Sequence, residues 1–229
     1  MTKKTSAQTQ ALKIPKFIIA ISQFLALLST KLVTQFAAKL FTTPIKHKTP
    51  KRELEMDAKS IQESIPIAEI GKEVVLYHYG TSDKKVLLVH GWSGRGTQLF
   101  KIADELVKAG YSTISFDAPA HGKSPGKTTI MVDFIATIAE IDKKFGPFEA
   151  AVGHSLGGMS VLNAIKKGLK VNHAVIIGSG DIIEDIMDDF VAKLGLKTNI
   201  SNELRLHFEK KYGEPMNNYS AYLAAMQTE

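Results

Sequence analysis

A serine flanked by glycines is the first feature of the chain that could do chemistry, in the segment Gly153-His154-Ser155-Leu156-Gly157. The pattern G-x-S-x-G between a strand and a helix makes a sharp turn that presents the serine hydroxyl, and the glycines leave the room that this turn needs. Residues 148–152 are a short apolar run typical of a strand, and residues 155–169 have helical spacing. Backbone N–H groups at the start of such a helix favour a developing oxyanion. We therefore predict Ser155 as a nucleophile and the Leu156 N–H as an oxyanion donor; the alternative is a plain glycine-rich turn.

A second loop follows the apolar run 85–90 and reads His90-Gly91-Trp92-Ser93-Gly94. A further oxyanion donor must come from a loop beside the serine turn, and this loop is the expected place. The N–H of Trp92 is our candidate, although its side chain could also form a pocket wall. We expect His90 to brace the loop rather than to transfer a proton.

A third loop follows residues 111–116 and reads Asp117-Ala118-Pro119-Ala120-His121-Gly122-Lys123-Ser124. With the three motifs in this order, the chain resembles the α/β-hydrolase superfamily over about residues 73–180, and more narrowly its single-domain esterases, lipases and peroxidase-like members. The resemblance implies Ser155 as nucleophile, Trp92 and Leu156 as oxyanion donors, and Asp117 and His121 as residues that organise a loop. Ala120 stands where such proteins usually have glycine.

The elements around these loops alternate between strand and helix. Alternation predicts a strand over residues 73–79, and a continuous apolar run predicts one over 85–90. Further strands are predicted over residues 111–116, 148–152 and 173–177, and helical spacing separates several of the strands. This order predicts an α/β fold with a doubly wound, mostly parallel sheet. Ligands of such sheets bind outside the carboxyl ends of the strands, where the three loops lie.

The catalytic base is the part of the pattern that the chain does not supply. A triad of this type has serine, acid and histidine in that order, and only His173 and His207 follow Ser155. His173 begins a predicted strand at the wrong end of the sheet, and His207 lies in a predicted helix. His154 adjoins the serine, but the turn directs their side chains apart. Asp181 is a fallback acid.

We therefore expect the triad histidine and acid beyond residue 229, in two further strands that this sheet lacks, with residues 181–229 as a truncated helical lid. The chain would then be a fragment or a shortened gene product. The predicted function is hydrolysis of small carboxylic esters by a serine hydrolase. The alternative is a non-catalytic hydrolase-like protein that binds a membrane or partner. A transferase or a cofactor-free peroxidase on the same fold is a third possibility.

Charge separates a leader from the body. Residues 1–52 hold nine Lys, one Arg and no acid, which leaves 19 basic against 23 acidic residues in the rest. A nucleic-acid-binding body is therefore not expected. The apolar run 17–28 is too short to span a bilayer. One helical stripe is formed by Ile18, Ile21, Leu25, Leu28, Leu32, Phe36 and Leu40.

This stripe predicts an amphipathic helix, followed by an exposed linker over residues 42–52. The helix could dock on the body, lie on a membrane surface through residues 14–41, or belong to a signal or transit peptide. The core would occupy residues 53–180 and open with a short amphipathic piece over 53–67. The oligomeric state stays open.

Cysteine is absent from the chain, so it has neither disulfides nor thiolate metal sites, which fits a cytoplasmic location. The acidic residues between 181 and 189 are expected on a solvated helix face, so we predict no metal. Residues 122–128 nearly match a phosphate-binding loop but place three residues, not four, between the glycines. We predict no cofactor.

Overall fold

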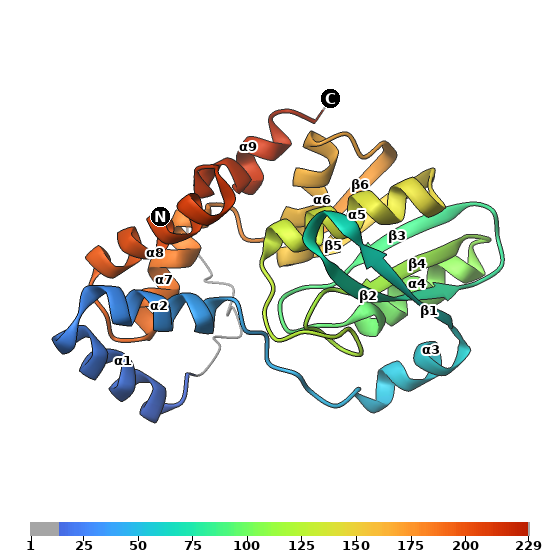
Figure 1. Cartoon of the computed structure of the whole chain (residues 1–229). Helices are drawn as coiled ribbons and strands as arrows, with labels where there is room; N and C mark the ends of the chain where they lie inside the picture. The colour runs from blue at the N-terminus through green and yellow to red at the C-terminus, as the bar shows by residue number, and fades with distance from the viewer. Residues whose placement is uncertain (1–13, 229) are drawn as a thin grey trace, which may run out of the picture.

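A six-stranded sheet forms the centre of the molecule (Figure 1) in the order β1-β2-β4-β3-β5-β6. The computed structural model describes residues 14–228. The strands from β3 onward pair in parallel, whereas β1 and β2 are antiparallel to their neighbours. The strands are β1 (Ile61–Ile67), β2 (Lys72–Tyr79), β3 (Lys85–Val89), β4 (Ser112–Asp117), β5 (Phe148–His154) and β6 (Val171–Ile177). The predicted doubly wound, mostly parallel sheet is confirmed.

Helices cover both faces of this sheet, so its central strands are buried on both sides. Every residue of β4 is buried. One core lies against the helices α5 and α6 and includes Phe134, Ile138 and Val161. The other includes Met56, Leu88 and Ala103. The covering helices are α3 (Leu54–Lys59), α4 (Phe100–Lys108), α5 (Met131–Phe145) and α6 (Leu156–Lys166).

Residues 53–67 differ from the sequence prediction of a single amphipathic piece. They begin in the 3₁₀ turn Lys51–Glu53 and continue as the short helix α3 and the strand β1. β1 is an edge strand whose first four residues are exposed and which contains Pro66. Proline is confined to edge strands and bulges, and it hides the alternation by which a strand is recognised.

A second group of helices lies at one end of the sheet (Figure 1). Here α2 packs beside α8, and side chains from α2, α7 and α8 form one core that includes Val33, Val191, Leu204 and Phe208. The role of residues 181–228 as a lid stays a prediction. The helices of this group are α1 (Lys16–Leu28), α2 (Thr30–Phe41), α7 (Ile183–Lys193), α8 (Thr198–Tyr212) and α9 (Ala221–Ala225).

The single N-terminal helix expected from the stripe is wrong, because the chain forms a helical hairpin. Ser29 is extended, with φ −166° and ψ 131°, and separates α1 from α2. The reversal lets α2 bury Val33 and Ala37 completely while α1 packs beside it against the same core. One straight helix could not place both segments against the same body.

Strand β6 is the last strand within residues 14–228 and forms an edge of the sheet. Its neighbour β5 is largely buried, whereas Val175 and Ile177 of β6 are exposed. None of the helices in the described part of the chain is both long enough and apolar enough to cross a membrane.

Candidate active site

Ser155 occupies a strained turn between β5 and α6. Its backbone has φ 52° and ψ −120°, a region that residues with a side chain rarely adopt. The turn is fixed to the end of β6, because the Ser155 N–H donates to the carbonyl oxygen of Ile177 at 2.9 Å. This is the strand–turn–helix geometry in which a serine hydroxyl stands free at the carboxyl edge of a sheet.

Two glycines of the motif are required by close backbone contacts. A Cβ atom on Gly157 would lie 2.3 Å from the carbonyl oxygen of Val89, and one on Gly153 would lie 2.5 Å from that of Gly157. Neither contact can relax without moving backbone. The glycines therefore let α6 start directly against β3 and β5, which places the helix N-terminus beside Ser155.

The loop after β3 lies against the serine turn. A Cβ atom on Gly91 would come within 3.1 Å of the Ser155 Cβ, so glycine allows the loop to approach this closely. Within residues 14–228, neither the Trp92 N–H nor the Leu156 N–H donates to a protein acceptor. N–H groups without a protein acceptor near a serine are able to stabilise an oxyanion.

His90 and His121 join the loops after β3 and β4. The Nε2 of His90 accepts the Ala118 N–H at 3.0 Å, and the Nε2 of His121 accepts the Ser93 N–H at 3.0 Å. Each Nδ1 therefore carries the proton and faces a carbonyl oxygen, that of Gly91 or of Pro119. Burial lowers the pKa of His90 to about 4 and that of His121 to about 3. Both rings are neutral braces between loops.

Asp117 organises the same region from the end of β4. Its buried carboxylate accepts the Gly96 N–H at 2.7 Å, the Lys123 N–H at 2.6 Å and the Tyr77 hydroxyl at 2.8 Å. Burial raises the pKa of Asp117, and these donors oppose that effect. A Cβ on Gly122 would lie 2.1 Å from the carboxylate, so the following loop can close over Asp117 only with glycine there.

Ala120 has a left-handed backbone, the conformation that favours glycine, which the resemblance led us to expect at this place. Its φ is +64°, and its side chain is buried. The loop is closed by a hydrogen bond from the Ala120 N–H to the Pro125 carbonyl oxygen at 2.9 Å. Ser124 adds a second closure, because its hydroxyl donates to the Asp117 carbonyl oxygen at 2.6 Å and accepts the Val75 N–H at 2.9 Å.

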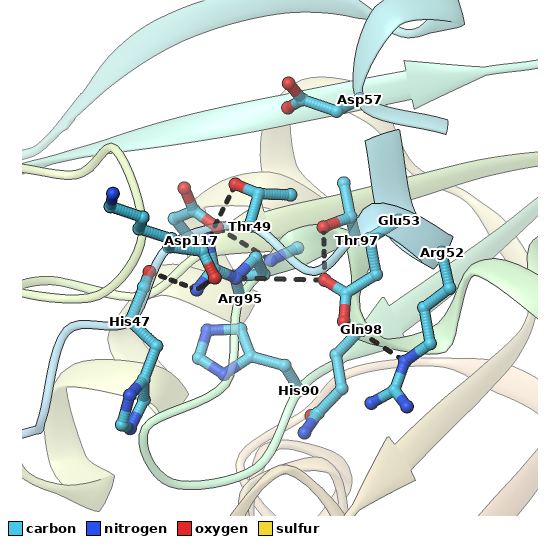
Figure 2. Close-up of polar contacts among 12 residues, drawn as sticks. His47, Thr49, Arg52, Glu53, Asp57, His90, Arg95, Thr97, Gln98 and Asp117 are labelled. Atoms are coloured by element: carbon cyan, nitrogen blue, oxygen red, sulfur yellow. Dashed lines mark hydrogen bonds and ion pairs between the residues drawn. The ribbon is translucent and has the colours of Figure 1, made fainter. Parts of the chain in front are cut away.

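The linker between α2 and α3 is tied to the loop after β3 rather than hanging free. The Ile45 N–H donates to the Ser93 hydroxyl at 3.0 Å, next to Trp92. Arg95 donates to the Thr49 hydroxyl at 2.7 Å and to the carbonyl oxygen of His47 (Figure 2). The linker is exposed in part, as its sequence indicates, but it runs as a strap across the loop that carries the Trp92 N–H.

Glu53 anchors the end of this strap. Its carboxylate is buried, accepts the Thr97 hydroxyl at 2.8 Å and lies 3.7 Å from the Arg95 Nε (Figure 2). Sequence reasoning missed Glu53, Arg95 and Tyr77, which support the site from other elements. Their contacts join residues far apart along the chain, so no local pattern could have revealed them.

The histidines near or after Ser155 lie as follows. His154 ends β5, and its Nδ1 is buried without a hydrogen-bond partner in the described residues. His173 lies within β6, beside Ala150, and His207 is exposed on α8. The Ser155 hydroxyl has no hydrogen bond to any side chain of residues 14–228. Within the described residues, the structure therefore brings the loop of Trp92 against the turn of Ser155 and Leu156 but joins no histidine to the Ser155 hydroxyl.

Asp181, the fallback acid, is bonded to backbone N–H groups at the start of α9 rather than to a histidine. Its carboxylate accepts the Tyr222 N–H at 2.9 Å, and its carbonyl oxygen accepts the Ala221 N–H at 2.8 Å. These bonds hold the start of α9. The acidic residues that follow line a shallow surface hollow along α7, and this hollow does not include Ser155. Among residues 14–228 no group of three histidine or carboxylate side chains could hold a metal ion.

The fold and the serine turn define a class that comparison with known proteins identifies. Residues 86–225, more than half of the chain, match the model of the alpha/beta hydrolase family. The chain therefore belongs to this family, which supports a function as a hydrolase. It has no significant match among curated protein sequences.

Two solved structures agree on the fold, and a third is reported for its sequence identity. An esterase from Pyrococcus furiosus is 18% identical with a TM-score of 0.56, over 78% of this chain and 71% of that chain. A thioesterase domain from the curacin biosynthetic pathway is 18% identical with a TM-score of 0.50, over 72% of this chain and 67% of that chain. A monoacylglycerol lipase from Paleococcus ferrophilus is 27% identical with a TM-score of 0.45, over 55% and 52%.

Proposed function

We propose that the protein hydrolyses small carboxylic esters through an acyl-enzyme on Ser155. The observation that carries this proposal is the backbone of Ser155, at φ 52° between β5 and α6. Strain of this kind persists only where the surrounding structure enforces it, and it is concentrated at functional sites. A plain glycine-rich turn would place glycine, not serine, at the left-handed position.

The proposed reaction begins when the Ser155 Oγ attacks the ester carbonyl carbon and a base takes the hydroxyl proton. The carbonyl electrons move onto the oxygen, which the Trp92 and Leu156 N–H groups would stabilise. The tetrahedral intermediate then expels the alcohol, which receives the proton from the base. Water then attacks the carbonyl carbon of the acyl-enzyme while the base takes a proton from it. The second tetrahedral intermediate expels the Ser155 oxygen, which receives the proton, and the carboxylic acid is released.

The base in this proposal is a histidine that the described residues do not place at Ser155, with an acid that orients it. His90 and His121 are unsuited, because both nitrogens of each ring already face backbone groups. His173 and His207 are exposed, and within residues 14–228 neither side chain forms a hydrogen bond with Ser155. Asp181 stays a fallback acid, although its carboxylate holds α9.

The test is covalent labelling with a fluorophosphonate on the product of the complete reading frame. We expect mass spectrometry to find the label on Ser155, and Ser155→Ala to lose both the label and the hydrolysis of p-nitrophenyl esters. Ser179→Ala is the matched control, because a Cβ on Gly158, in the first turn of α6, would lie 3.2 Å from the Ser179 Cβ. Ester hydrolysis that survives Ser155→Ala would refute the proposal.

The second candidate is a non-catalytic hydrolase-like binding protein, which the unpaired Ser155 hydroxyl favours. Reading the gene past codon 229 separates the two. A continuing frame with two strands, an acid and a histidine supports the enzyme. A stop codon at that place leaves no conventional triad in one chain and makes the binding protein the leading proposal.

A further inference from the structure

Helix α1 is apolar on two sides, and only one of them is packed. Ile18 and Leu25 face the core shared by α2, α7 and α8, and Ser22 is fully buried beside them. A Cβ on Gly195 would lie 3.3 Å from Ile19, so the turn after α7 also presses on this side. These contacts fix the rotation of α1 about its axis and decide which side it shows to solvent.

The outward side of α1 is a continuous apolar face. Phe17, Phe24 and Leu27 are 66%, 61% and 85% exposed. Among the described residues, six of the fourteen exposed large apolar side chains fall between positions 17 and 32. We call these six the α1 face: Phe17, Ile21, Phe24, Leu27, Leu28 and Leu32. The five on α1 follow at steps of three, four and one, which places them on one side of a helix.

A helix that is apolar all round belongs in a core or a membrane rather than in water. Scattered exposed apolar residues need no explanation, but a contiguous face of two phenylalanines and several leucines marks an interaction site. At 13 residues, α1 is about 20 Å long. This is shorter than the roughly 30 Å of a hydrocarbon core, so the helix can lie on a bilayer but not cross it.

The charges around the α1 face select the occupant. Lys16, Lys31 and Lys39 of the hairpin are exposed, and none of them pairs with a carboxylate in the described residues. Residues 1–52 contain no acid at all. A second copy docking through the same face would bring like charges together. An anionic surface would instead gain from every lysine.

We propose that the α1 face binds the surface of a bilayer that contains anionic phospholipid. The phenylalanine and leucine side chains enter the boundary between headgroups and acyl chains, and Lys16 and Lys31 meet the phosphates. The helix lies parallel to the surface, because its packed side stays on α2 and the α7–α8 turn. This proposal does not depend on the chemistry of Ser155, so the two can fail separately.

The test is co-sedimentation of the full chain with vesicles of phosphatidylcholine, with or without a quarter of phosphatidylglycerol. We expect at least tenfold stronger binding to the anionic vesicles, reduced by high salt. The double variant Phe24→Ser/Leu27→Ser should lose at least tenfold, and Lys16→Glu/Lys31→Glu should lose the preference for anionic lipid. Both variants alter exposed side chains and should keep the thermal midpoint measured without lipid.

The matched control is Leu206→Ser/Met226→Ser, which removes two exposed apolar side chains from α8 and the residue after α9. It should bind the vesicles as the unchanged chain does. Equal loss in this control, or no preference for the anionic vesicles, would overturn the proposal. A dimer in sedimentation equilibrium that Phe24→Ser/Leu27→Ser dissolves would also overturn it, because a second copy would then cover the face.

Discussion

The loops around Ser155 and the α1–α2 hairpin differ in which side chains they bury and which they expose to solvent. The loops hide polar groups and pair them: Asp117, His90 and His121 are buried, and each has backbone or hydroxyl partners. The hairpin shows apolar side chains to solvent and leaves its lysines unpaired. Burying unpaired polar groups and exposing a large apolar face are both unfavourable.

The two regions differ in whether their exposed or polar groups have partners within the molecule. The loops depend on partners inside the molecule, since Asp117, His90 and His121 are each matched by specific donors or acceptors. The outward side of α1 has no such partner in the described residues. A substitution in the loops should therefore change the stability of the isolated protein, and one on the α1 face should change only association.

The largest effect is expected from Asp117→Ala. The substitution leaves the N–H groups of Gly96 and Lys123 and the Tyr77 hydroxyl buried without their acceptor. Each unsatisfied buried group costs about 1–3 kcal/mol, so the free energy of unfolding should fall by about 3 kcal/mol or more. Urea denaturation followed by circular dichroism measures the loss.

Two variants bracket this prediction. Tyr77→Phe removes one of the three hydrogen bonds and should lower the free energy of unfolding by only about 1 kcal/mol. Asp185→Ala alters an exposed carboxylate on α7 and should have almost no effect. If Asp117→Ala were as mild as Tyr77→Phe, the carboxylate would not be the centre of the loop network.

Acid should destabilise the protein through the two buried histidines. Their pKa values are about 4 and 3 in the folded state, below the usual 6.5. The unfolded chain therefore binds protons that the folded chain does not, and stability falls as the pH drops from about 6.5 toward 4. Each histidine should contribute roughly 2–3 kcal/mol over this window. Asp117, whose pKa burial raises, acts in the opposite direction.

His121→Gln tests this pH dependence. An amide oxygen placed near the Nε2 position can accept the Ser93 N–H without titrating. Urea denaturation at pH 7, 5.5 and 4.5 should show a smaller loss of stability in the variant than in the unchanged protein. Parallel curves would mean that His121 does not resist protonation in the folded state.

The sequence predicted the loops better than the hairpin, and the reason is the range of the contacts. Ser155, Gly153 and Gly157 lie within five residues, so their spacing alone predicts the turn. Strand β3 is buried on both faces and its sequence is a continuous apolar run. The break at Ser29 has no such local signal. It depends on α2 packing against α8, far along the chain.

The strap shows the same limit within the site. Ile45 and Ser93 are 48 residues apart, and Arg95 reaches Thr49 across a similar distance. Each residue looks like an ordinary polar or apolar position of a loop. Only the folded chain shows that the linker supports the loop which carries the Trp92 N–H.

The two sides of the hairpin should respond differently to removal of apolar atoms. Val33→Ala on α2 removes two methyl groups from a fully buried position and should lower the free energy of unfolding by about 2 kcal/mol. Leu27→Ala on α1 removes more atoms from a side chain that is 85% exposed, and should change it by less than about 0.5 kcal/mol. Thermal denaturation without lipid measures both. A destabilisation by Leu27→Ala equal to that by Val33→Ala would show that the α1 face is packed in solution.

The smallest effect is expected from Ala120→Gly, although this position is buried within the loop network. The left-handed backbone of Ala120 costs about 1–2 kcal/mol, which glycine would recover. Glycine also loses about 0.5–1 kcal/mol to the entropy of the unfolded chain and about 0.8 kcal/mol from the missing buried methyl. These effects nearly cancel, so stability should change by less than about 0.5 kcal/mol.

The control is Ala118→Gly, two residues earlier, because Ala118 is buried but lacks the positive φ. It has the same two losses with nothing recovered, and should lower stability by about 1.5 kcal/mol. Equal losses in the two variants, measured by urea denaturation, would show that Ala120 is not strained. A clear difference would show that the left-handed backbone of Ala120 is strained and that the buried methyl group offsets this strain.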